Sequence, residues 1–409
     1  MTETTDRVTV PLGEELIAPL HPVYYGVPVS QAPTGPRLAP DRRVWMVTRY
    51  QDAKTVLANS YLAKDVRRAT DLYNGHTGSN RPVIGGAISR HLLNYDAPDH
   101  TRLRAMVAGT FREDRLHARE PVVEGIVDGL LDGLEGRDRI DLITDYSLPF
   151  SVANTCHLLG VPVEDMQALF GFAALLKKFV TPDEADEVCA GMAATLRELI
   201  AKKRERPGDD LLTRVLGAHA AGEMSDDELV AMYYVLIVAG YETSVNLIAN
   251  GILTLLLHPD QLTMLRADPS LLPGAVEEIL RYEGPAAMST VRFTTAPIAV
   301  GDTVIPEGEF VLVSLRVANR DPERYPDPDR FDITRSAAGH LSFGHGAHHC
   351  VGAPMGRLEG AIAIGRFIDR FPDVALGVEP AEIVWVDGTM VRNLSALPIR
   401  LQGAAHESE

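Results

Sequence analysis

Near its C-terminal end the sequence reads His340-Leu341-Ser342-Phe343-Gly344-His345-Gly346-Ala347-His348-His349-Cys350-Val351-Gly352-Ala353-Pro354. Cys350 is one of three cysteines in 409 residues, and glycines lie on both sides of it. Glycine allows positive φ and lets a flat ligand approach the backbone closely. Apolar residues at helical spacing follow from Met355 onward. Cys350 is therefore predicted on a glycine-rich loop before a helix N-terminus, where free N–H groups favour a thiolate that ligates a metal or acts as a nucleophile.

The pattern Phe343-Gly344-x-Gly346-x-His348-x-Cys350-x-Gly352 resembles the haem-binding loop of the cytochrome P450 superfamily. The resemblance implies that Cys350 is the axial thiolate of haem iron, a ligand that favours O–O cleavage. It also implies that Phe343, Gly344, His348 and Gly352 contact the haem. A plain glycine-rich turn around a buried cysteine is one alternative. A zinc site that adds the nearby histidines is another, although the spacing fits no usual zinc pattern and no second cysteine is close.

The composition restricts the class of protein. The chain is 45% hydrophobic, enough for a sizeable core, and its net charge of −17 argues against a nucleic-acid or anionic-membrane partner. Three widely spaced cysteines make no disulfide framework, which indicates a reducing cytoplasm. The first residues lack an apolar signal core, and we expect no membrane anchor. We expect a single domain, with residues 1–42 as an extended, proline-rich lead segment and 403–409 as a polar tail.

Local patterns predict several elements. A strand is predicted over residues 43–48, and helices are predicted over 50–58, 122–134, 150–159 and 187–203. Residues 298–310 alternate with turns and predict hairpin strands. The resemblance implies the mostly helical, single-domain α+β fold of the family, a triangular prism with small sheets.

A long apolar helix is predicted after Ser225. Ser225 and Glu228 have the spacing of a capping box, the apolar run extends from Leu229 to Leu257, and His258-Pro259 ends it. The length of about 45 Å would suit a membrane span. Polar residues within the run and acids at its start favour a buried central helix instead.

The centre of this helix reads Ala239-Gly240-Tyr241-Glu242-Thr243. It resembles the family's oxygen-handling segment beside the haem. The resemblance implies that Ala239 and Gly240 leave room for oxygen, with Gly240 permitting a local widening of the helix. It also implies that Thr243 positions water and that Glu242 relays protons from solvent. A satisfied polar kink is the structural alternative.

Other matches concern the cofactor's carboxylates and the frame around the loop. His100 and Arg104 lie four residues apart on one predicted helix face. The resemblance implies that they and Arg292 bind the haem propionates; for His100 and Arg104 a solvated helix face is the alternative. Glu278-x-x-Arg281 resembles the family's buried ion pair, with Arg330 as the third member; these residues are expected to be structural.

The resemblance implies an apolar substrate pocket lined by Val83, Ile84, Leu175, Val238, Met288, Val291 and Met390. Within the family, the sequence is most similar to soluble actinobacterial members that oxidise macrolides and other polyketides. We therefore expect a haem b monooxygenase that inserts one atom of O2 into a C–H or C=C bond of a bulky apolar natural product. No flavin or iron–sulfur segment is evident, so electrons are expected from NAD(P)H through a separate ferredoxin and ferredoxin reductase. A cytoplasmic monomer is expected.

Three alternatives stay open on the same scaffold. The substrate could be a terpenoid, an aromatic compound or a cyclic peptide. The enzyme could catalyse coupling or isomerisation, or use peroxide. A non-catalytic haem protein that recruits a partner is the third alternative, although such a chain would be expected to lose Glu242 or Thr243.

Overall fold

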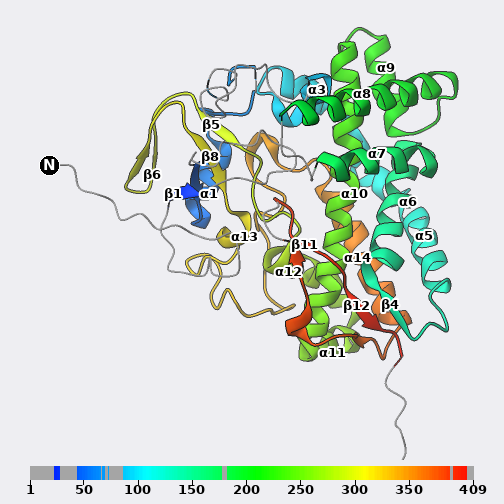
Figure 1. Ribbon diagram of the computed structural model, residues 1–409. Helices are drawn as coiled ribbons and strands as arrows, with labels where there is room; N and C mark the ends of the chain where they lie inside the picture. Colours follow the sequence, from blue (N-terminus) through cyan, green and yellow to red (C-terminus); the bar gives the residue numbers. More distant parts are fainter. Residues whose placement is uncertain are drawn as a thin grey trace, which may run out of the picture.

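The computed structural model describes residues 23–27, 44–65, 67–69, 72, 86–176, 182–386 and 390–402. Helices dominate it, and the largest sheet lies to one side of them (Figure 1). The α-helices are α1 (Tyr50–Ala58), α3 (Asp99–Ala108), α4 (Glu113–His117), α5 (Glu120–Asp132), α6 (Leu148–Leu159), α7 (Val163–Leu176), α8 (Pro182–Glu205), α9 (Leu211–Ala220), α10 (Asp226–Leu257), α11 (Pro259–Ala267), α12 (Leu272–Glu283), α13 (Leu315–Ala318) and α14 (Ala353–Arg370). Single helical turns are η1 (Gly86–Ser89), η2 (Leu92–Asn94), η3 (Gly109–Phe111), η4 (Ile143–Ser147), η5 (Pro269–Leu271), η6 (Gly346–His348) and η7 (Pro380–Glu382).

The strands are short and form four small sheets. They are β1 (Val23–Val27), β2 (Val44–Val47), β3 (Leu62–Ala63), β4 (Arg139–Asp141), β5 (Arg292–Thr294), β6 (Ile298–Val300), β7 (Thr303–Ile305), β8 (Phe310–Val313), β9 (Ala375–Leu376), β10 (Trp385–Val386), β11 (Asn393–Leu394) and β12 (Pro398–Arg400). The largest sheet has the order β1-β2-β8-β5-β3, in which only the β2–β8 pair is parallel. The others are β4-β12-β9, β10-β11 and the β6-β7 hairpin.

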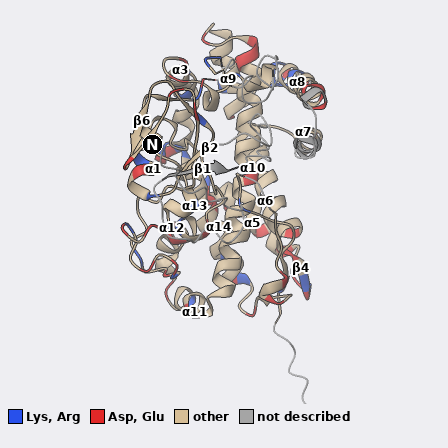
Figure 2. Ribbon diagram, turned by 60° about the vertical axis from the view of Figure 1, so that its left-hand side comes forward, with Lys and Arg blue, Asp and Glu red and all other residues tan. Residues whose placement is uncertain are grey.

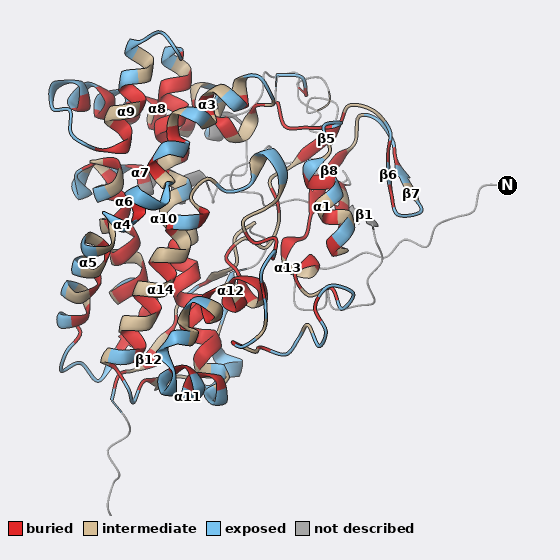
Figure 3. Cartoon of the chain, turned by 180° about the vertical axis from the view of Figure 1, so that it is seen from behind, coloured by how far each residue is buried: buried red, intermediate tan, exposed pale blue. Residues whose placement is uncertain are grey.

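The long helix α10 lies at the centre of the helical part of the molecule. Ser225 caps it: the Ser225 hydroxyl accepts from the Glu228 N–H, and the Glu228 carboxylate accepts from the Ser225 N–H. The two largest hydrophobic cores include residues from its two halves, one with α5, α12 and α14 and the other with α8 and α9 (Figure 3). Gly251 lets α14 approach closely, because a Cβ there would lie 2.6 Å from the Ile364 Cδ1.

Burial, not membrane insertion, explains the apolarity of α10. The helix is long and apolar enough to cross a membrane, yet most of its apolar side chains are packed inside the protein. Charged residues lie mainly on outer elements such as α8, and after the first turn of α10 only Glu242 carries a charge (Figure 2). The interpretation of this segment as a buried central helix is confirmed.

The other local predictions also hold where the structure describes them. α1 spans the predicted residues, β2 lies within the predicted strand, and α5, α6 and α8 match the predicted helices to within a few residues. β6 and β7 pair as the predicted hairpin. The lead segment lies almost wholly outside the described residues, and the polar tail lies entirely outside them.

Candidate functional site

The cysteine loop is held by its glycines. Gly344 and Gly346 have φ of +72° and +75°, a region that other residues rarely adopt. A Cβ on Gly346 would also lie 2.9 Å from the carbonyl oxygen of Leu57, at the end of α1. The Cys350 N–H donates to the Phe343 carbonyl at 2.8 Å, which closes the loop. These contacts fix the backbone conformation of the loop, and Cys350 lies just before α14.

The Cys350 sulfur lies at the N-terminus of α14. It accepts from the backbone N–H groups of Gly352 and Ala353. Burial raises the pKa of the Cys350 thiol, while those N–H groups and the charge of Arg104 act in the opposite direction. Although protein surrounds the sulfur closely enough to desolvate it, the residue is accessible to water. The sulfur is therefore largely desolvated yet reachable, and a cation bound to it would ionise it.

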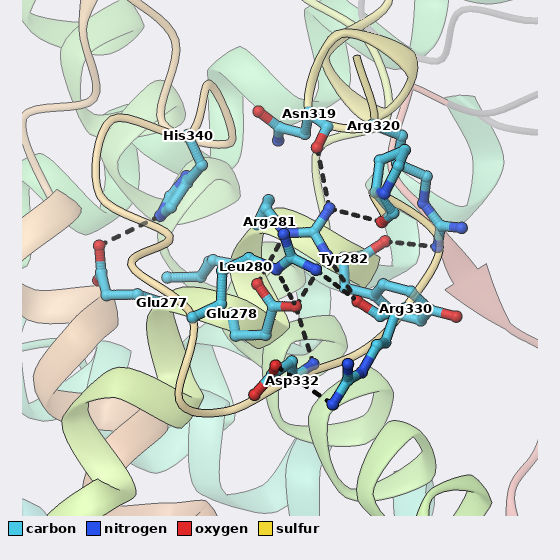
Figure 4. Close-up of polar contacts among 12 residues, drawn as sticks. Glu277, Glu278, Leu280, Arg281, Tyr282, Asn319, Arg320, Arg330, Asp332 and His340 are labelled. Carbon is cyan, nitrogen blue, oxygen red and sulfur yellow. Dashed lines mark hydrogen bonds and ion pairs between the residues drawn. The ribbon is translucent and has the colours of Figure 1, made fainter. Parts of the chain in front are cut away.

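A buried ion pair supports this loop from α12. Arg281 binds Glu278 through both its Nε and an Nη atom, at 2.7 and 2.8 Å, and neither side chain is exposed. Arg281 also donates to the carbonyls of Asn319 and Pro328, as Figure 4 shows in part. The Asn319 side chain in turn binds Ser342, just before the loop, at 2.8 Å. These contacts join α12 to the irregular segment that leads to Cys350.

The third member of this cluster is Arg335, so the assignment of Arg330 is wrong. The Arg335 Nε lies 3.4 Å from a Glu278 carboxylate oxygen, and its side chain is largely buried. The side chain of Arg330 is 67% exposed and lies 3.6 Å from Asp332 (Figure 4). Arg330 contributes only its carbonyl, which accepts from Arg281 at 3.4 Å. The segment turns between these two residues, and this directs the guanidinium of Arg330 outward.

The centre of α10 is less buried than most of the helix. Residues 238–243 are not buried, and Ala239 is exposed, whereas most of the helix on either side is buried. The Thr243 hydroxyl donates to the Ala239 carbonyl at 2.9 Å. The helix is α-helical throughout, so the widening expected near Gly240 is not seen. Glu242 accepts from the Asn393 side-chain amide at 3.4 Å, which links α10 to β11.

A buried carboxylate that contacts the residue after Thr243 was missed in the sequence. Glu359 on α14 is buried and accepts from the Asn154 amide at 2.6 Å and from the Ser244 hydroxyl. Burial raises the pKa of Glu359 to about 7. The sequence held a signal: Glu359 follows Met355 by four residues and precedes Ala363 by four, so it occupies the apolar face of α14. A carboxyl group that titrates near neutrality can hold or release a proton.

Basic side chains gather on the same part of the molecule as the cysteine loop. The rings of His100 and His348 lie 4.1 Å apart, and the His100 Nε2 and His348 Nδ1 are buried without a hydrogen-bond partner. Burial lowers the pKa of His348 far below its usual value, and the charges that act on it, from Lys64, Arg104 and Arg292 among others, are all basic. Arg292 is 4% exposed, and burial lowers its pKa to about 10. Buried basic groups are costly unless they are paired, so a bound anion would stabilise this cluster.

These features together fit a haem. Its iron would take the Cys350 sulfur, and its two carboxylates would meet the basic cluster of His100, Arg104, Arg292 and His348. The zinc alternative gains no support, because the described part of the chain contains no group of three or more His, Cys, Asp or Glu side chains that could hold a metal ion.

The predicted pocket residues are only partly described. Val238 is half-buried and borders a small apolar cavity between α7, α8 and α10, together with Tyr234 and Tyr241. The Met390 carbonyl accepts from the Met288 N–H at 3.4 Å, so these two residues are neighbours. Met288 and Val291 are half-buried beside the sheet core. Val83, Ile84 and the side chain of Leu175 lie outside the described residues.

Comparisons with known proteins agree with this arrangement. The cytochrome P450 family model matches residues 137–376. Cytochrome P450 107B1 of Saccharopolyspora erythraea is 46% identical over 87% of this chain and 89% of its own length. The 6-deoxyerythronolide B hydroxylase of the same organism is 38% identical over 91% of this chain and 94% of its own.

Among solved structures, that of the tirandamycin C-bound monooxygenase TamI superposes with a TM-score of 0.84 at 36% identity, over 93% of this chain and 94% of TamI. Family membership implies a haem iron and the use of O2. The chain belongs to the cytochrome P450 family and is a monooxygenase homologous to tailoring hydroxylases of macrolide and polyketide biosynthesis.

Proposed function

We propose that the protein inserts one atom of O2 into a C–H or C=C bond of a bulky, mostly apolar polyketide, with a macrolactone as the first candidate. The observation that carries the proposal is the loss of burial at residues 238–243, in the middle of an otherwise buried helix. An acid and an alcohol, Glu242 and Thr243, are presented there beside apolar neighbours. This is what oxygen chemistry on an apolar substrate requires.

The haem b supplies the activation of O2 when it is bound. Cys350 is the residue that would hold its iron, on the loop fixed by Phe343, Gly344 and Gly352. His100, Arg104, Arg292 and His348 would bind its carboxylates, since they form a basic cluster in which two imidazole nitrogens have no partner. Charge-assisted hydrogen bonds of this kind are the strong ones and also fix orientation.

Protons reach the centre of α10 through side chains of this chain. Glu242 lies beside Thr243 and contacts Asn393 on β11, so it can pass a proton from the side of β11 toward Thr243. Ser244, the residue after Thr243, and Glu359 form a second buried donor set. Because the pKa of Glu359 is raised to about 7, its carboxyl oxygen can carry a proton at neutral pH. Ala239 and Gly240 present no bulky side chain, which keeps the site open.

The substrate class is supported by the relatives and by the lining. One relative is named for the hydroxylation of 6-deoxyerythronolide B, and TamI is solved with tirandamycin C. The described lining residues of this chain, Val238, Met288, Val291 and Met390, are all apolar. We include Val83, Ile84 and Leu175 in the proposed pocket on the sequence resemblance alone.

The electrons are proposed to come from NAD(P)H through a separate ferredoxin and its reductase. The protein is proposed to act as a monomer in the cytoplasm. The net charge of −17 agrees with a soluble, well-dispersed protein.

The test is a spectral titration of the purified haem-loaded protein with macrolactones, glycosylated macrolides, terpenoids, aromatics and cyclic dipeptides, followed by product analysis with O2 or peroxide. A saturable low-to-high-spin change with one macrolactone class, and a product one oxygen atom heavier that requires O2 and electrons, is expected. Binding of only small aromatics or peptides would overturn the substrate class. Turnover with peroxide alone, or a coupled product without added oxygen, would overturn the reaction.

A further inference from the structure

Lys64 is a buried cation that lacks a carboxylate partner. It follows β3, is 4% exposed, and its ammonium donates to the neutral hydroxyl of Thr290 at 2.7 Å. Among the described residues, none offers Lys64 a carboxylate oxygen within ion-pair distance. A buried ammonium is costly unless it is paired with an anion.

A second buried lysine among the described residues shows how such a group can be satisfied within the chain. Lys203 is 7% exposed, and its ammonium lies 2.7 Å from the Asp210 carboxylate and 2.5 Å from the Gly160 carbonyl. Among the described residues, Lys64 has a single neutral acceptor at a similar degree of burial. The difference indicates that the anion for Lys64 comes from outside the described part of the chain.

Asp96 holds the backbone at Lys64 and does not neutralise the ammonium directly. Its carboxylate accepts from the backbone N–H groups of Lys64 and Asp65, each at 3.1 Å. This contact anchors the end of β3 to the segment before α3, which carries His100 and Arg104. The polypeptide therefore places the lysine beside the basic cluster through its backbone.

The basic side chains around Lys64 outnumber the acidic ones, so a dianion would balance their charge. The charge of Lys64 acts on His100 and His348, and the charge of Arg292 acts on Lys64. With Arg104 the site holds three basic side chains against the carboxylate of Asp96, an excess of two. Burial lowers the pKa of Lys64 well below its usual value, so a bound anion would help to keep its ammonium charged. A haem carries two carboxylates.

We propose that the Lys64 ammonium binds a haem carboxylate and completes the basic cluster of His100, Arg104, Arg292 and His348. The inference rests on the proposed haem site and adds a ligand to it. Because the lysine is fixed through Asp96 to the start of α3, haem binding also joins β3, α3 and β5 around one pair of carboxylates.

The experiment compares Lys64→Met with the unsubstituted full-length chain, each loaded with haem or with haem dimethyl ester, which has no carboxylate charge. The rate of haem release to an excess of apomyoglobin is measured for all four. A charge-assisted hydrogen bond implies release roughly tenfold faster or more for Lys64→Met with haem. With the dimethyl ester the two proteins are expected to release at similar rates. The ferric–ferrous midpoint potential should also fall in Lys64→Met, because a cation near the haem stabilises the added electron.

Two variants control for general damage. Lys203→Met removes the other buried ammonium and is expected to leave the ratio of haem to ester release unchanged. Lys64→Arg keeps the charge and is expected to keep that ratio. Lys64→Gln retains a donor for Thr290, so it serves the same comparison if Lys64→Met does not fold.

Equal acceleration of haem and ester release by the Lys64 substitutions would overturn the proposal and make Lys64 a purely structural residue. That outcome would leave the proposed function intact. Failure of the unsubstituted chain to bind haem at all would overturn both.

Discussion

Glu359→Gln is expected to change how stability depends on pH. The pKa of Glu359 is raised from 4.5 to about 7 by burial between α6, α10 and α14. Between these values the folded protein binds a proton that the unfolded chain has released. The contribution of Glu359 to stability is therefore fully present below pH 4.5 and is lost as the pH rises to about 7. A difference of about 2.5 pH units corresponds to about 3 kcal/mol.

Glutamine is neutral at every pH and resembles the protonated acid in shape. The free energy of unfolding of Glu359→Gln, relative to the unsubstituted protein, should thus rise by up to about 3 kcal/mol between pH 4.5 and 7. Urea unfolding followed by tryptophan fluorescence at several pH values measures it. Because both proteins carry the same haem, terms common to both cancel in the difference.

Glu277→Gln is the matched control. Glu277 lies on the same helix as Glu278. Burial acts to raise its pKa, but the contacts with His340 at 3.4 Å and with Arg357 at 2.6 Å outweigh burial and lower the pKa to about 2. Its contribution is present above pH 4.5 and is lost only as the pH falls toward 2. The Glu277→Gln difference should therefore change by much less than about 3 kcal/mol between pH 5 and 7. A flat profile for Glu359→Gln over the same interval would refute the reasoning about this buried carboxyl group.

Three further substitutions test other parts of the account. Arg335→Met should destabilise the protein by about 1–3 kcal/mol in urea unfolding, because it leaves the buried carboxylate of α12 less well paired, whereas Arg330→Met should stay within about 0.5 kcal/mol. Thr243→Val should keep the haem spectrum but lower the product formed per NAD(P)H roughly tenfold or more, since proton delivery is lost. Thr254 is another threonine whose hydroxyl donates to its own helix, and Thr254→Val should leave the product formed per NAD(P)H unchanged. Gly346→Ala should reduce haem retention and stability by about 1–2 kcal/mol or more, because it adds a Cβ at positive φ against backbone atoms.

The outcomes that contradict these predictions are distinct. Equal destabilisation by the two arginine substitutions would restore Arg330 to the cluster. Unchanged coupling in Thr243→Val, or equal loss in Thr254→Val, would remove the special role of Thr243. Gly136→Ala is the control for the glycine: its φ is +76° but a Cβ there meets nothing within 4 Å. If it cost as much as Gly346→Ala, the steric part of the argument would be wrong.

Elements specified by local signals could be predicted from the sequence. The capping box at Ser225 and the proline after His258 set the ends of α10. Glu278 and Arg281 lie three residues apart on one helix, so their spacing alone indicates that they can pair. The short spacings around Cys350 likewise place the cysteine on a loop before α14.

Contacts between distant segments could not be predicted in the same way. The choice of Arg335 over Arg330 depends on the path of an irregular segment, which has no periodicity to follow. Lys64 follows a two-residue strand with Asp65 beside it, and nothing local indicates that its ammonium is buried. The burial of Glu359 could have been predicted, because an acidic residue at i, i+4 spacing from apolar residues lies on the apolar face of the helix.

The most direct test of the central claim is the identity of the iron ligand. The carbon monoxide complex of the reduced, purified full-length protein is compared with that of Cys350→His by absorption spectroscopy. The account predicts that the unsubstituted protein binds haem and shows the strongly red-shifted Soret band of thiolate ligation, and that the variant shows an unshifted, imidazole-type band. A red-shifted band that persists in Cys350→His, or an unsubstituted protein that takes up no haem when haem is supplied, would contradict the assignment of Cys350.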